Sequence, residues 1–182
     1  MALMGCLLGE MGDKSQSLVQ ALAKRFERNS AVIAGILAAA VANAAIAACA
    51  GALIGPMLGG NARLLFLALA ILFLGIGMMW PVKSPELLEG WRVGPFLTAT
   101  LGVFILGFGE GGQFLILGLS ARTAEPVLAA VGGAVGVTAA LIPAVLLRDS
   151  FTALPLRAIR QVGGVIMLVT AFILTVQALE LA

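Results

Sequence analysis

Long apolar runs separated by short polar breaks dominate the pattern of this chain. A membrane-spanning helix needs about 20 mostly apolar residues, and six stretches meet that length: 1–26, 30–58, 62–80, 95–119, 126–147 and 158–181. The breaks between them contain the glycines, prolines and charges that are typical of loops. The runs are continuous rather than alternating, which disfavours the strands of a membrane barrel. The pattern therefore predicts an all-α membrane protein with six transmembrane helices.

Composition strengthens this interpretation and excludes several function classes. Hydrophobic residues make up 61% of the chain, charged residues make up 11%, and the mean hydropathy is +1.10, whereas a soluble domain is about one quarter charged. The chain has no histidine, and its two cysteines have no metal-type spacing. Histidine-based proton shuttles, zinc sites and serine–histidine triads are therefore excluded. Only one aspartate falls in a predicted span, so we expect neither an aspartyl protease nor another enzyme.

The distribution of Lys and Arg predicts the orientation of the chain. Basic residues are enriched in cytoplasmic loops. Eight of them fall on the side of the first, third and fifth breaks, namely Lys24, Arg25, Arg28, Lys83, Arg92, Arg148, Arg157 and Arg160. Arg63 and Arg122 fall on the other side. We therefore expect a bacterial inner-membrane protein whose N- and C-termini both lie outside the cytoplasm.

Two segments of the chain resemble each other and predict an internal repeat. Segments 9–25 and 109–122 both begin Gly-Glu-x-Gly, and both carry a Gln nine residues before an Arg. The simplest alignment gives the second copy a three-residue deletion and places Asn43 opposite Thr138. Since each copy holds three spans, the second would be inverted, as in many secondary transporters. The predicted organisation is repeat 1 over 1–80, a cytoplasmic linker over 81–94 and repeat 2 over 95–182.

The opening stretch GEMGDKSQ, residues 9–16, places charges inside the first apolar run. Glu10, Asp13 and Lys14 have the i, i+3, i+4 spacing of one helix face, and Ser17 and Gln20 continue that face. Charged groups inside a membrane are costly unless they are paired, hydrated or coordinated. We expect this stripe to face the protein interior, with glycines beside the acids that let the helix loosen. Carboxylate, amide and hydroxyl oxygens favour a hard cation such as Mg²⁺, Ca²⁺ or Mn²⁺.

The charge balance of this region points to exchange of a cation for protons. Three carboxylates lie in spans (Glu10, Asp13 and Glu110), and Lys14 is the only base predicted to lie among them. A structural ion pair of Lys14 with Glu10 or Asp13 is the alternative reading, but it leaves carboxylates over. About two negative charges remain, which one divalent cation or two protons would neutralise.

These considerations predict a site with contributions from both repeats. The predicted metal ligands are Glu10, Asp13, Glu110, Gln113 and Gln16. The predicted supporting residues are Lys14, Ser15, Ser17, Gln20, Gly12, Gly112, Asn43 and Thr138. For Asn43 and Thr138, hydrogen bonds that pack helices together are an alternative role.

The motif Glu-x-Gly-Asp-Lys-Ser/Thr-Gln, here EMGDKSQ and repeated in a fourth span, resembles the Gdt-type family of manganese and calcium transporters. The resemblance covers essentially the whole chain. It implies that Glu10 and Asp13 bind the cation, with Lys14, Ser15 and Gln16 beside them. The second motif departs from the family pattern, because EGGQ keeps only Glu110 and Gln113.

The resulting hypothesis is a secondary transporter that exports Mn²⁺ or Ca²⁺ from the cytoplasm in exchange for protons. A non-transporting cation-binding subunit or sensor and a small-solute exporter are the alternatives. We expect no tightly bound cofactor beyond the transported ion, and no nucleic-acid partner. The expected partners are the divalent cation, protons and the lipid bilayer, and the chain is compatible with a homo-oligomer.

Overall fold

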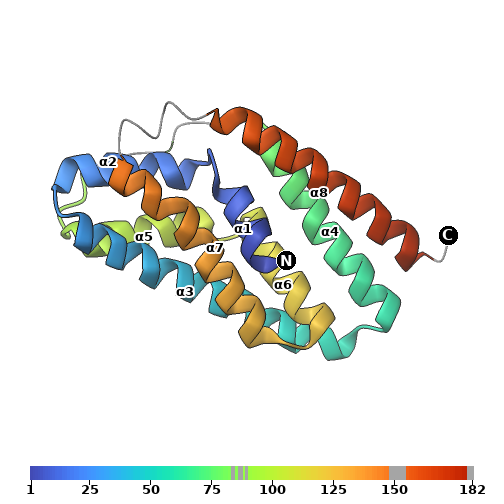
Figure 1. Ribbon diagram of the computed structural model, residues 1–182. Helices are drawn as coiled ribbons and strands as arrows, with labels where there is room; N and C mark the ends of the chain where they lie inside the picture. Colours follow the sequence, from blue (N-terminus) through green and yellow to red (C-terminus); the bar gives the residue numbers. More distant parts are fainter. Residues whose placement is uncertain (83–84, 86–87, 89, 148–154, 180–182) are drawn as a thin grey trace.

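The computed structural model describes residues 1–82, 85, 88, 90–147 and 155–179, and these residues are helical apart from short connections. The order of elements is α1 (Ala2–Glu10), α2 (Lys14–Phe26), α3 (Asn29–Ile54), the 3₁₀ turn η1 (Gly55–Met57), α4 (Gly60–Met79), α5 (Pro95–Gly107), α6 (Gly111–Thr123), α7 (Pro126–Leu147) and α8 (Leu156–Ala178). Figure 1 shows them as a bundle in which α4 and α8 lie side by side along one flank.

The structure confirms that several helices can span a membrane, but it does not confirm the predicted number of six. Within the described residues, four helices are long and apolar enough to cross a membrane: α3 with η1, α4, α7 and α8. The pair α5 and α6, bent by 69°, would make a fifth span. The first predicted span, 1–26, is interrupted at the opening motif and forms two helices, α1 with nine residues and α2 with thirteen. At 1.5 Å per residue neither is long enough to cross a core of about 30 Å alone.

Both motif-bearing segments are broken in the same way. Gly12 and Gly109 have φ values of 71° and 79°, a region in which any residue with a Cβ is strained. The side-chain oxygen of the Gln four residues later accepts a hydrogen bond from each glycine N–H, at 2.7 Å from Gln16 and 2.6 Å from Gln113. A glycine and a glutamine at this spacing therefore form each break.

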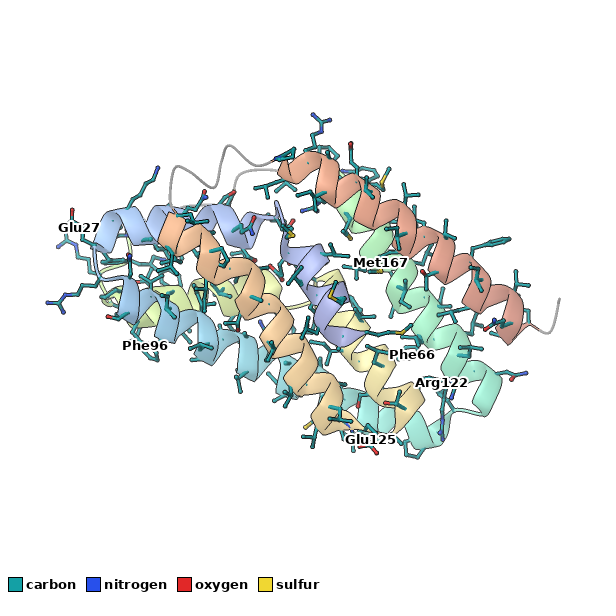
Figure 2. All side chains as sticks on the ribbon, in the orientation of Figure 1. Glu27, Phe66, Phe96, Arg122, Glu125 and Met167 are labelled. Atoms are coloured by element: carbon teal, nitrogen blue, oxygen red, sulfur yellow. The ribbon has the colours of Figure 1, made fainter. Side chains whose placement is uncertain are left out.

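The two halves of the chain share a constant register. Around the two breaks, equivalent helix boundaries differ by 97 positions (10 and 107, 14 and 111, 26 and 123, 29 and 126), whereas the outer boundaries differ by 93 to 99. The three-residue deletion predicted for the second motif is therefore wrong, because Glu110 occupies the position of Asp13, and Gly107 occupies that of Glu10. The same register places Asn43 opposite position 140 rather than Thr138. Glu27 and Arg122, near the ends of equivalent helices, lie at opposite ends of the molecule (Figure 2).

Helix packing follows this register in part. Helix α1 packs on α7 as α5 packs on α3, and α3 contacts α7 along the centre of the bundle. The α3–α5 approach is close, since a Cβ on Gly35 would lie 2.7 Å from the Phe96 carbonyl oxygen. The equivalent Gly132 lies against α1. The exception is that α4 packs along α6, whereas α8 has no comparable contact with α2 among the described residues.

The first and third breaks lie on one side of the molecule, as the topology predicts. Arg25 donates hydrogen bonds of 2.7 Å to the carbonyl oxygens of Leu88 and Trp91, which joins the end of α2 to the central linker. Lys83 and Arg148, two of the residues used to predict orientation, lie outside the described part of the chain. Arg160 was counted among the basic residues of the cytoplasmic side, and it is a buried residue in the second turn of α8.

Candidate metal site

Three carboxylates from the two broken segments converge between the helix ends. Glu10 is the last residue of α1, Asp13 immediately precedes α2, and Glu110 immediately precedes α6. One oxygen from each lies within 4.8 Å of the others. Two ligands of one Ca²⁺ lie no more than about 5 Å apart, because Ca²⁺–oxygen distances are about 2.3–2.6 Å. The three acids are therefore close enough to hold one cation together.

The continuous helix face predicted for this stretch does not exist. The break at residues 11–13 separates Glu10 from Lys14, and it turns Asp13 toward the other carboxylates instead of along the helix. Glu10 and Asp13 are buried, and the Asp13 side chain is 7% exposed whereas the Glu110 side chain is 20% exposed. The first two acids lie deeper in the protein than the third.

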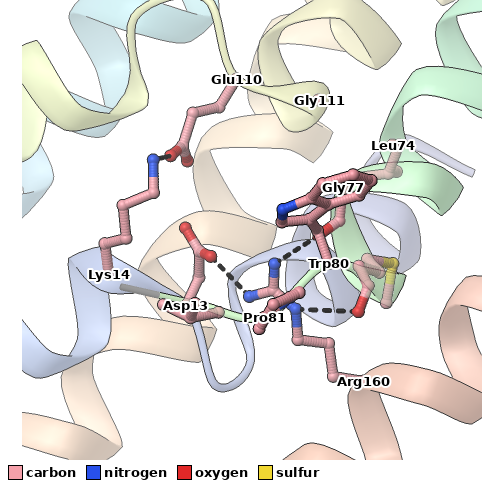
Figure 3. Close-up of a pocket in the computed structure, with 11 residues that line it drawn as sticks. Asp13, Lys14, Leu74, Gly77, Trp80, Pro81, Glu110, Gly111 and Arg160 are labelled. Atoms are coloured by element: carbon pink, nitrogen blue, oxygen red, sulfur yellow. Dashed lines mark hydrogen bonds and ion pairs between the residues drawn. The ribbon is translucent and has the colours of Figure 1, made fainter. Parts of the chain in front are cut away.

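Two of the three carboxylates, Asp13 and Glu110, are paired with bases (Figure 3). Lys14 Nζ lies 3.0 Å from Glu110 Oε1, not beside Glu10 or Asp13 as the alternative reading supposed. Arg160 Nη1 lies 2.5 Å from Asp13 Oδ1. Glu10 has no ion-pair partner among the described residues, and its Oε2 is buried without a hydrogen bond. With every group ionised the cluster has a net charge of −1, rather than the −2 that the sequence indicated.

Arg160 is the residue at this cluster that sequence reasoning missed. It lies close to the predicted start of the last span, where basic residues normally face the cytoplasmic surface. Its guanidinium also donates to the backbone carbonyls of Gly12, Gly77 and Met78. The available signal was an arginine within the first turns of an apolar helix, but only the tertiary structure shows its partner.

Gln16 and Gln113 have an evident structural role. Gln16 Nε2 donates to the Ala140 carbonyl oxygen at 2.8 Å, and Gln113 Nε2 lies 3.5 Å from the carbonyl oxygen of Asn43. Positions 43 and 140 are equivalent in the common register, so each glutamine ties its break to the same position of α3 or α7. Their oxygens accept the glycine N–H groups described above. A role as metal ligands stays a prediction.

A small cavity of about 20 Å³ lies on the inner side of Glu10. Ser15, Asn43, Gly112 and Gln113 also line it. The Ser15 hydroxyl oxygen, like Glu10 Oε2, is buried without a hydrogen-bond partner. A space of about 10–15 Å³ is enough for one water molecule. The cavity therefore has the size and the polar atoms to hold a single small ligand beside Glu10.

The remaining predicted residues lie farther from the three acids. Ser17 and Gln20 line a cavity of about 620 Å³ between α2 and α8, together with Asp13 and Arg160. A second cavity of about 650 Å³ reaches Asp13, Glu110 and Arg160 past Trp80 and Pro81 (Figure 3). Thr138 is not brought to the site. Its hydroxyl donates to the Ala134 carbonyl of its own helix, and it lines an apolar groove with Leu37 and Val41.

Comparison with known proteins gives a family for the chain. Residues 1–86 and 95–182 match the family described as "Divalent cation/proton antiporter GDT1". The chain is also similar to a protein of Vibrio cholerae serotype O1 (strain ATCC 39541 / Classical Ogawa 395 / O395) named "Putative manganese exporter", with 31% identity over 170 residues, 90% of this chain and 83% of the relative. No solved structure matches the chain. The match over both halves shows that the chain belongs to the GDT1 family of divalent cation/proton antiporters.

Proposed function

We propose that this antiporter exports Mn²⁺ from the cytoplasm in exchange for protons, and that Glu10, Asp13 and Glu110 bind the ion. The observation that carries the proposal is the convergence of one oxygen from each acid within 4.8 Å, at the meeting point of two broken helices. Oxygen ligands suit Mn²⁺, and the similar Vibrio cholerae protein is named for manganese. Ca²⁺ is the second candidate, because its ligands are also oxygens.

Glu10 is the acid best suited to carry the coupled proton. Asp13 and Glu110 each have a basic partner, whereas Glu10 is buried with one oxygen unsatisfied. A lone carboxylate in a membrane interior is stabilised by a proton or by a cation. Exclusive binding of one or the other at Glu10 would couple metal movement to proton movement without any histidine.

The proposed transport cycle uses two inverted repeats, α1 to α4 and α5 to α8. Their constant register and the opposite placement of equivalent helix ends support this assignment. The α4–α6 interface in one place is equivalent to the α8–α2 interface in the other. The first is a packed contact, whereas a cavity lies between α2 and α8. Alternation of these interfaces would expose the acids first to one side and then to the other. The cavities reach Trp80 and Pro81, next to the linker predicted to be cytoplasmic, which fits uptake of the ion from that side.

Flux measurements on reconstituted protein test the assignment. In proteoliposomes with an imposed pH gradient, Glu10→Gln should reduce Mn²⁺ flux at least about tenfold, equivalent to about 1.4 kcal/mol. Glu125→Gln is the matched control, since Glu125 is exposed and lies beyond the end of α6. Undiminished flux in Glu10→Gln would refute the site. Mn²⁺ binding without any flux in the wild-type protein would favour the sensor alternative.

A further inference from the structure

The guanidinium of Arg160 is held by more than its carboxylate. Nε donates to the Met78 carbonyl oxygen at 3.1 Å, and Nη2 donates to that of Gly77 at 2.7 Å. Nη1 donates to Asp13 Oδ1 and, at 3.3 Å, to the Gly12 carbonyl oxygen. Three of these four acceptors are backbone carbonyls. Arg160 would therefore keep most of its hydrogen bonds if Asp13 turned away.

The carbonyls that hold Arg160 belong to a favourable place for a cation. Gly77 and Met78 lie in the last turn of α4, where backbone carbonyls lack helical partners and carry the negative end of the helix dipole. The α4–α8 contact fixes this end of α4 beside α8. Arg160 is thus anchored on its own helix pair, and Asp13 reaches it from the break between α1 and α2.

Metal binding conflicts with the contact between Arg160 and Asp13. The three acids and two bases have a net charge of −1, so a divalent ion among them would make the buried cluster +1. Since −1 and +1 are equal in magnitude, the conflict is local: an ion bound at Asp13 would lie beside a base that already contacts that carboxylate, and like charges repel. The Lys14 side chain is 44% exposed and can retain its charge in water, whereas that of Arg160 is 10% exposed. The bound metal ion would therefore be repelled mainly by the buried charge of Arg160.

We propose that Arg160 is an internal competitor of the transported cation at Asp13. It pairs with Asp13 when the metal does not, it gives up Asp13 when the metal binds, and its return helps release the ion. It would thereby set the affinity and the turnover of the transporter. This inference rests on the assignment of Asp13 to the cation site in the proposed function.

Substituting Arg160 tests this inference, because loss of a competitor should tighten Mn²⁺ binding, whereas loss of a structural anchor should not. Arg160→Gln keeps a side chain that can donate to the α4 carbonyls but removes the charge. We expect the dissociation constant for Mn²⁺, measured by titration calorimetry, to fall at least about tenfold, or about 1.4 kcal/mol. The KM of flux in proteoliposomes should fall as well, and the maximal flux should also fall because release is slower. Arg157→Gln is the matched control, an exposed arginine three residues earlier on α8, and it should change neither quantity.

A second variant keeps the test decisive if Arg160→Gln does not fold. Lysine retains the charge but lacks the planar set of donors that engages four acceptors at once. Arg160→Lys should therefore hold Asp13 less firmly and tighten Mn²⁺ binding by a smaller factor. Weaker or unchanged Mn²⁺ binding in these variants would overturn the inference and leave Arg160 as a structural anchor.

The same measurements on Glu10→Gln separate this inference from the proposed function. Loss of Mn²⁺ binding in Glu10→Gln together with no change in the Arg160 variants would refute only the role of Arg160. Unchanged binding and flux in Glu10→Gln would refute the proposed site itself, and the competition at Asp13 with it.

Discussion

The two breaks share a backbone but differ in chemistry. In the first, Glu10, Asp13, Lys14 and Ser15 surround the glycine. In the second, the equivalent positions hold Gly107, Glu110, Gly111 and Gly112, so one carboxylate remains. The conformations nevertheless agree, with φ and ψ of −92° and 174° at Asp13 and −82° and 163° at Glu110. The backbone conformation of each break therefore depends on its glycine and glutamine and not on the charged residues around them.

Among the paired substitutions, neutralising the two equivalent acids should give the largest difference in stability between the two breaks. Asp13→Asn removes a charge-assisted hydrogen bond from buried Arg160, so we expect a loss of about 1.5–3 kcal/mol in stability. Glu110→Gln leaves Lys14, which is half-exposed, and should cost less than about 1 kcal/mol. Thermal unfolding in detergent measures both. Equal losses would show that the two ion pairs are energetically alike, against the difference in burial.

Removing the two equivalent glutamines should give a smaller contrast. Gln16 is buried and makes hydrogen bonds of 2.7 and 2.8 Å, so Gln16→Ala should destabilise the protein by about 2 kcal/mol. Gln113 makes one bond of 2.6 Å, and its other contacts are 3.5 Å long, so Gln113→Ala should cost about 1 kcal/mol. The same unfolding assay applies. A larger effect at Gln113 would contradict the proposed basis of the breaks.

Position 107 in the second half is equivalent to Glu10. An acid placed there should have the smallest effect on stability, provided that a neighbouring side chain is shortened to make space. A Cβ on Gly107 would lie 2.9 Å from Asn43 Nδ2, so Gly107→Glu alone should be overpacked by about 1–3 kcal/mol. Adding Asn43→Ala should restore most of that stability and tighten Mn²⁺ binding severalfold, because a fourth carboxylate then faces the site. Calorimetry compares the double variant with Asn43→Ala. No gain in affinity would place position 107 away from the ion.

The outcome at particular residues shows how much of the site could be predicted from the sequence. Glu10, Asp13 and Glu110 stand out because acids are rare in apolar runs, and the structure brings them together. The break was only partly foreseen, since a glycine is also tolerated inside a helix. The repeat was aligned through its two glutamates, which concealed the ungapped match of Asp13 with Glu110. Arg160 could not be found because its partners lie 82 or more residues away along the chain, and only the folding of the chain brings them near.

The construction of the breaks suggests how to recognise such transporters when their acidic motifs have changed. Both breaks contain a glycine followed four residues later by glutamine, with the same backbone conformation and the same hydrogen bond between the pair. The residues between them are free to vary without loss of the backbone conformation. Searching for this spaced pair, rather than for glutamate and aspartate, should therefore detect relatives whose ion preference has diverged.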